Sequence, residues 1–231
     1  MKPSTTCCPK TPLPWNEPAV GGRWSRRSLL LTAGTLPVAA VALPALAARS
    51  QEAAVFIRRM VDRALEILSR TDRSREARIA ELERLLEEAT DLDLIAKLVL
   101  GAYWRKATPE QRRRYLQLFR KMIRRQIAAN ISRYDGQRIE IVGSRDIDDR
   151  DTMVRTLVYD SKRDAPYRID WRVRHSDGRF LIIDVVGEGV SLLITKRKEF
   201  GEIVSAKGIE GLLTAMARKI EGNDDPPRAR S

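Results

Sequence analysis

Few residues in this chain could act as a catalytic group, and they do not form a recognisable set. The single histidine, His175, precedes Ser176-Asp177-Gly178, which is typical of a tight turn, so we expect an exposed turn residue rather than a general base. Ser191 lies in the segment GVSLL (residues 189–193), which lacks the second glycine of the turn that exposes a nucleophilic serine. The sequence therefore offers no triad of Ser, His and Asp.

Three carboxylates, Asp170, Asp184 and Glu188, fall on or beside segments expected to be strands. Paired carboxylates could hydrolyse a glycosidic bond, but basic neighbours on the same or the adjacent strand favour structural ion pairs or backbone contacts. A hydrolase acting through Asp170 and Asp184 is the weaker alternative, and we expect no enzyme. No cluster of Cys and His has the spacing of a zinc site, and no glycine-rich loop indicates a phosphate or dinucleotide site, so no metal or cofactor is expected.

The chain is strongly basic, with 43 Lys and Arg against 31 Asp and Glu and a formal net charge of +12. Such a charge can attract nucleic acid, an anionic membrane or an acidic protein partner. Both cysteines, Cys7 and Cys8, lie close to the N-terminus. The rest of the chain therefore has neither a disulfide framework nor a thiolate site.

The first 47 residues have the features of an export signal. Arg26-Arg27 precedes an apolar stretch from Leu29 to Leu46, and Ala45-Leu46-Ala47 forms a small-x-small cleavage pattern. The paired arginines resemble a twin-arginine signal, with Leu29 where a phenylalanine is common. An uncleaved anchor is the alternative, but a spanning helix needs about 20 continuous apolar residues, and a glycine and two prolines interrupt this stretch.

We accordingly predict three parts: a twin-arginine-type signal peptide at 1–47, a single folded domain at 48–222 and a disordered tail at 223–231. The export signal predicts a periplasmic location. Nucleic acid is then not expected as a partner, despite the basic charge.

Helical periodicity dominates from about residue 51 to residue 133. Apolar stripes at 57–68, 79–89 and 94–99 predict three helices. The clearest start of a helix is Thr108-Pro109-Glu110-Gln111, because it offers a Thr N-cap, a Pro at the first helical position and a Gln for a capping box. The helix that follows has an apolar face, and much of the rest of its surface is basic.

After Asp135-Gly136 the period changes from helical to alternating, which predicts short strands at about 139–141, 154–158 and 167–173. The turn at 176–178 leads into a final strand from Arg179. Two helices follow, near 196–206 and 209–220, separated by Gly208. We predict an α+β domain in which a twisted antiparallel sheet of about four strands is covered by N-terminal and C-terminal helices.

The final strand has more aliphatic surface than a sheet with one wet face requires. Apolar residues at 181–186 and 190–194 lie on both sides of it, and Gly187 and Gly189 would let the strand bulge and bend. A bent strand wrapped by helices can leave an apolar cavity between sheet and helices. The alternative is a strand packed solidly on both faces.

Three segments carry a family resemblance: LGAYWRKATPEQR at 100–112, PYRIDW at 166–171, and EGVS at 188–191 preceded by Asp184. Together with KGIEGL at 207–212, they resemble the MlaC family of periplasmic phospholipid-binding proteins, the toluene-tolerance auxiliary components of an ABC transport system. Phe180 stands where the family commonly has Trp. A related branch is linked to hopanoid metabolism.

The resemblance implies a lipid carrier. It would hold phospholipid tails in its cavity and shuttle lipid between an outer-membrane lipoprotein/porin complex and an inner-membrane ABC transporter complex, which maintains outer-membrane lipid asymmetry. Each exposed methylene costs about 0.8 kcal/mol in water, so such a carrier needs apolar walls. We expect inward-facing apolar side chains to contact the tails: Phe119, Val154, Val158, Ile169, Trp171, Val173, Ile182, Val190 and Leu192.

Two alternatives stay open besides the hydrolase. One is a hopanoid-associated lipid-binding protein. The other is a basic module whose helix at 108–133 binds a protein or membrane surface, with a solid core and no lipid cavity.

Overall fold

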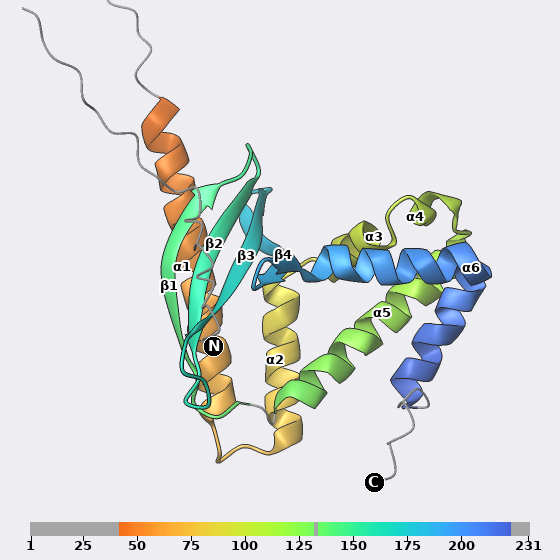
Figure 1. Ribbon diagram of the computed structural model, residues 1–231, viewed down its shortest axis with the longest axis horizontal. Coiled ribbons are helices and arrows are strands. Elements are labelled where there is room, and N and C mark those ends of the chain that lie inside the picture. The colour runs from red at the N-terminus through yellow and green to blue at the C-terminus, as the bar shows by residue number, and fades with distance from the viewer. Residues whose placement is uncertain (1–41, 132–133, 223–231) are drawn as a thin grey trace, which may run out of the picture. The chain divides into compact units, whose positions relative to one another are not determined.

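The computed structural model describes residues 42–131 and 134–222, with side chains from Arg49 onward (Figure 1). The predicted tail and almost all of the predicted leader lie outside the described residues. The elements are α1 (Ala42–Ser69), α2 (Arg75–Ala89), α3 (Leu92–Leu100), α4 (Tyr103–Lys106), α5 (Pro109–Asn130), β1 (Arg138–Asp146), β2 (Asp151–Tyr159), β3 (Tyr167–Ser176), β4 (Arg179–Gly187), β5 (Val190–Ser191) and α6 (Leu192–Glu221). In the part of the chain that is described, no helix combines the length and apolarity needed to cross a bilayer.

The strands form one antiparallel meander in the order β1-β2-β3-β4-β5. This confirms the predicted α+β class, with a short fifth strand added at the edge. Helix α1 packs across β1 and β2, and α2 packs beside α1 and touches β4 (Figure 1). The sheet face that meets these helices is called the inner face below.

Two clusters of buried apolar side chains hold the fold together. The first lies between α1, α2 and the inner face, and includes Ile57, Leu85 and Val154. The second joins α3, α5 and α6, with partly buried side chains of α4 packed against it. At its centre Tyr115, 1% exposed, donates a hydrogen bond to the Ala96 carbonyl at 2.9 Å. The described part of the chain therefore has two apolar centres, and α5 packs against both α2 and α6.

The start of α5 is built as predicted. Thr108 Oγ1 accepts a hydrogen bond from the Gln111 backbone N–H at 3.2 Å, and the Gln111 side chain accepts one from the Thr108 N–H at 3.0 Å. Both halves of the capping box are present, with proline at the start of the helix, where its missing N–H costs nothing.

The end of the predicted final strand differs from our expectation. Strand β4 ends at Gly187, and Glu188 and Gly189, with φ of 48° and 85°, make a tight turn into β5. Helix α6 then begins at Leu192, before the predicted start near residue 196. The glycines therefore reverse the chain rather than bend a strand around a cavity. Helix α6 is kinked where the separator was predicted, at Gly208 (φ 68°, ψ −179°).

A contact across the turn between β4 and β5 accounts for the early start of α6. The Asp184 carboxylate on β4 accepts hydrogen bonds from the Ser191 hydroxyl and from the Leu193 backbone N–H, the latter at 3.0 Å. The Ser191 hydroxyl in turn accepts from the Ile194 N–H at 3.0 Å and caps the helix. Asp184 thus fixes the first turn of α6 against the sheet, because it satisfies a donor that a helix start leaves free.

Candidate functional site

An apolar cavity of about 350 Å³ lies between α1, α2, the last turns of α5 and the inner face of the sheet. Several of its lining residues are only half-buried, so the cavity is open to solvent. Its walls are Ile57, Met60, Val61, Ala64, Leu65, Leu68, Leu82, Leu85, Leu86, Ala89, Ile127, Asn130, Ile131, Ile139, Trp171 and Ile182. Asn130 is the one member of this set whose side chain is not largely hydrocarbon.

The helical walls follow from the sequence. Positions 57, 61, 64, 65 and 68 share one face of α1, and positions 82, 85, 86 and 89 share one face of α2, because residues three or four apart lie on the same side of a helix. Ala64 and Ala89 are small residues among leucines and isoleucines. Short side chains at these points help to leave space between the helices and the sheet.

The sheet wall is held by a hydrogen-bonded indole. Trp171 Nε1 donates to Thr156 Oγ1 at 3.1 Å, and the Thr156 hydroxyl donates to the Ile169 carbonyl at 2.8 Å. Thr156 is 0% exposed, so this pair is satisfied inside the protein. The polar edge of the indole is therefore occupied, and its hydrocarbon surface can face the cavity.

Polar contacts frame the end of the cavity that α5 closes. Arg75 donates to the Ala128 carbonyl at 2.6 Å, and Arg78 donates to the Leu68 carbonyl at 3.1 Å, so both arginines bond backbone oxygens next to lining residues. Nearby, Arg124 Nε lies 2.9 Å from Glu83 Oε1, and this hydrogen bond lowers the pKa of Glu83. The Arg75 and Arg124 contacts connect α2 with α5, and the Arg78 contact connects α2 with α1.

The structure places the predicted tail contacts in different surroundings. Trp171 and Ile182 line the cavity. Val154 and Val173 are buried in the surrounding cluster. In the register of the sheet, Val158 and Ile169 lie on the inner face with them, Val158 buried and Ile169 half-buried. These four are not among the residues of the cavity wall.

Three predicted positions need correction. Val190 and Leu192 are 59% and 57% exposed, so the prediction that they point inward is wrong, because the turn at Gly187 carries them to the sheet edge and the start of α6. Phe119 is buried, at 3% exposure, but in the second cluster. The stripes of α1 and α2 were recognised as buried faces, yet nothing in them indicated that they would face empty space.

The chemistry considered for the carboxylates has no support in the geometry. Asp170 forms ion pairs with Arg155 at 3.0 Å and Arg168 at 3.5 Å, as the basic neighbours indicated. Asp184 is occupied by the start of α6. Across residues 42–131 and 134–222, no group of three or more His, Cys, Asp and Glu residues could hold a metal ion.

His175 lies at the end of β3 rather than in an exposed turn, so that prediction was wrong. It is half-buried, with its ring 4.8 Å from that of Phe180. Two larger grooves, of about 820 and 580 Å³, have charged walls, which include Glu87, Asp93 and Arg179 in the first and Glu202 and Arg218 in the second. Of these three hollows in the described part of the chain, the cavity beside α1 and α2 has the wall that consists most fully of hydrocarbon.

Three basic side chains of the helix predicted as an interaction module form ion pairs with carboxylates of neighbouring helices. Arg120 lies 2.7 Å from Asp93, and Arg114 lies 3.4 Å from Glu210. The cavity also departs from the solid core that this alternative required.

Comparisons with known proteins agree with the predicted resemblance. A family model described as "MlaC protein" matches residues 58–218. The chain is 28% identical over 129 residues to the intermembrane phospholipid transport system binding protein MlaC of Haemophilus influenzae, a match covering 54% of this chain and 60% of that protein. It is 24% identical over 153 residues to the toluene tolerance protein ttg2D of Pseudomonas putida, covering 63% of this chain and 71% of the relative.

Among solved structures, the fold is similar to that of a phospholipid-binding protein from Ralstonia solanacearum in complex with a phospholipid. The TM-score is 0.65 at 22% identity, covering 75% of this chain and 99% of that one.

Proposed function

The chain belongs to the MlaC family, and on that premise we propose that it is a periplasmic carrier that holds lipid tails in the cavity beside α1 and α2. Its cargo would be phospholipid, as the names of its relatives state for those proteins. It would pass lipid between an outer-membrane lipoprotein/porin complex and an inner-membrane ABC transporter complex. No catalytic step is required, since the lipid is moved and not changed.

The observation that carries this proposal is the apolar wall of an open cavity. Moving one methylene out of water is favourable by about 0.8 kcal/mol of free energy. Aliphatic walls therefore stabilise an acyl chain nearly as well as the interior of a bilayer does. A cavity lined almost entirely by hydrocarbon and accessible from outside would be unfavourable without an apolar ligand.

The size of the cavity limits what it holds in this conformation. A methylene occupies roughly the 30 Å³ that a water molecule takes in the liquid. At about 350 Å³ the cavity has room for roughly a dozen such groups, or most of one acyl chain. Uptake of a second chain would require the α1–α2 pair to move away from the sheet.

The test is to purify the domain from residue 48 onward and to measure bound lipid by native mass spectrometry and by solvent extraction. We expect phospholipid at defined stoichiometry, and exchange of labelled phospholipid with vesicles. A protein that is lipid-free and takes up no lipid from vesicles would refute the proposal. Extraction also identifies the cargo, so a hopanoid in place of phospholipid would assign the chain to the hopanoid-associated branch.

A further inference from the structure

The sheet face opposite the helices, called the outer face here, is rich in arginine. Across β2 and β3, Arg155 lies opposite Asp170, and Arg174 lies opposite Asp151. Directly paired residues share a face, and the neighbouring positions Val154 and Val173 are buried on the inner face. The arginine face is defined by Arg155, Arg168, Arg172 and Arg174.

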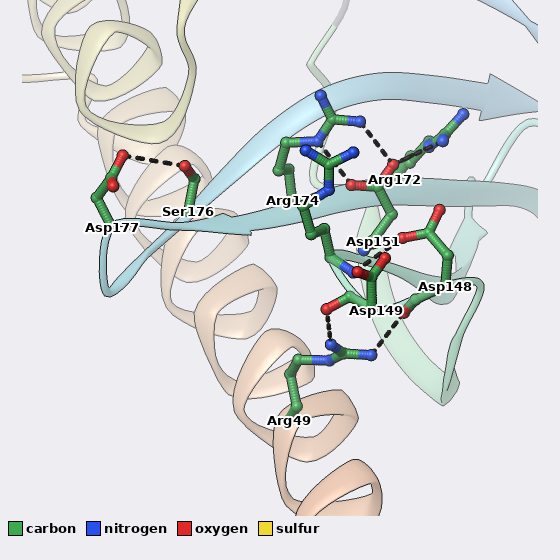
Figure 2. Close-up of polar contacts among 9 residues, drawn as sticks. Arg49, Asp148, Asp149, Asp151, Arg172, Arg174, Ser176 and Asp177 are labelled. Atoms are coloured by element: carbon green, nitrogen blue, oxygen red, sulfur yellow. Dashed lines mark hydrogen bonds and ion pairs between the residues drawn. The ribbon is translucent and has the colours of Figure 1, made fainter.

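Asp151 holds one half of the arginine face in place. This carboxylate is 0% exposed and lies 2.8 Å from Arg172 Nε and 2.7 Å from Arg174 Nε (Figure 2). Burial opposes its ionisation, but the hydrogen bonds from Arg174 and Arg172 keep the pKa of Asp151 below its usual value. The loop before it is fixed as well, because Arg49 on α1 donates to the backbone carbonyls of Asp148 and Asp149 (Figure 2).

Asp170 holds the other half in the same way. It is 6% exposed and forms ion pairs with Arg155 and Arg168. The side chains of the four arginines are between 22% and 38% exposed, so the guanidinium groups lie above the carboxylates. The register adds two carboxylates to this face, Asp184 opposite Arg172 and Glu140 opposite Leu157, and two more arginines, Arg138 and Arg145. Six positive groups against four negative ones leave an excess of positive charge on the outer face.

We propose that the arginine face docks onto an acidic protein surface, presented by the membrane complexes between which the carrier moves. This inference rests on the proposed function. The guanidinium groups are already ordered by buried carboxylates, so docking would cost little further side-chain entropy. A planar guanidinium group can donate two parallel hydrogen bonds to one carboxylate, which favours a partner whose carboxylates have a fixed geometry. Binding to a fluid bilayer would be stabilised less by this fixed arrangement of guanidinium groups, because lipid headgroups have no fixed geometry.

The experiment places a photo-crosslinking residue at Met153, which lies opposite Arg172 on this face, and expresses the full chain in its native host. We expect an adduct with a subunit of the inner-membrane or outer-membrane complex, joined at a peptide rich in Asp and Glu. The variant Arg168→Gln/Arg172→Gln should lower the yield of this adduct at least about tenfold. It leaves each buried carboxylate one arginine, so the fold should persist.

Arg105→Gln/Arg113→Gln is the matched control, because it removes the same charge from exposed helical positions. It should leave the adduct unchanged. Both variants should keep the melting temperature and the bound lipid of the parent protein. An adduct that survives Arg168→Gln/Arg172→Gln, or no adduct at all from a lipid-loaded protein, would overturn the docking proposal and leave the carrier intact.

Vesicles containing phosphatidylglycerol test the other class of partner. Binding to such vesicles that disappears in Arg168→Gln/Arg172→Gln would assign the arginine face to a membrane and overturn the proposal. If the parent protein carries no lipid, that result would instead contradict the proposed function. It would then also contradict the proposal that the arginine face docks for lipid exchange.

Discussion

Replacing Ala64 with phenylalanine would place an aromatic ring in the cavity beside α1 and α2. Ala64 lines that cavity from α1 and is half-buried. A benzene ring fits a cavity of about 150 Å³, so the new side chain would take close to half of the 350 Å³ available. The space left would hold roughly six or seven methylenes instead of about a dozen.

The loss of about five buried methylenes sets the size of the effect. At about 0.8 kcal/mol each, it costs about 4 kcal/mol of binding free energy. Since every 1.4 kcal/mol is a factor of ten, Ala64→Phe should bind a long acyl chain roughly a thousandfold more weakly. The ring enters empty space, so we expect the free energy of unfolding to fall by less than the ~1–3 kcal/mol typical of an overpacked core.

The assay compares dissociation constants for lysophospholipids with eight and sixteen carbons in the chain. Ala64→Phe should lose most of the affinity for the longer chain and little of that for the shorter one. Ala206→Phe, at an exposed position on α6, is the matched control and should bind both as the parent does. Unchanged affinity for the long chain in the folded Ala64→Phe protein would refute the location of the tail site.

Three further predictions concern stability. Asp184→Ala removes the acceptor that fixes the start of α6, so thermal melting should show a loss of about 1–3 kcal/mol while lipid stoichiometry stays the same; an unaltered melting temperature would contradict that role. Thr108→Ala removes the cap of α5 and should cost about 1 kcal/mol in urea unfolding, with Thr108→Ser as the variant that restores it. The pKa of Glu83 is lowered in the folded state, so its contribution to stability is present above the unfolded pKa of about 4.3 and is lost as pH falls through the lower folded value. The difference in urea stability between the parent and Glu83→Gln should therefore shrink between pH 6 and pH 3, and a gap independent of pH would argue against the Arg124 contact.

Local signals were sufficient for much of the fold. The capping box at Thr108 depends on four adjacent residues, and the alternation along β3 depends on the two faces of one strand, so both could be predicted from the sequence. The end of β4 could not. The apolar residues after Gly189 continue the composition of a strand, and what converts them into a helix is Asp184, whose contact with Ser191 crosses a turn.

The cavity was harder to predict, because apolar periodicity says that a face is buried but not what it meets. Phe119 lies on a buried face of α5, yet that face packs into the second cluster. The stripe at 57–68 has the same appearance in sequence and lines the cavity. Whether such faces close on each other depends on distances set by the whole fold, and the volumes of Ala64 and Ala89 matter only once those distances are known.

Helix α5 is a single rigid rod with its two ends in different surroundings. Tyr115 and Phe119 anchor one part among α3 and α6, while Ile127 and the residue that follows the helix, Ile131, form part of the far wall of the cavity. A substitution at the anchored part can therefore tilt the rod and reshape the distant pocket without touching any ligand. Loss of lipid from a Phe119→Ala protein would therefore reflect an indirect effect of moving the helix. Direct contact between a side chain and the lipid should be tested only at positions in the cavity wall.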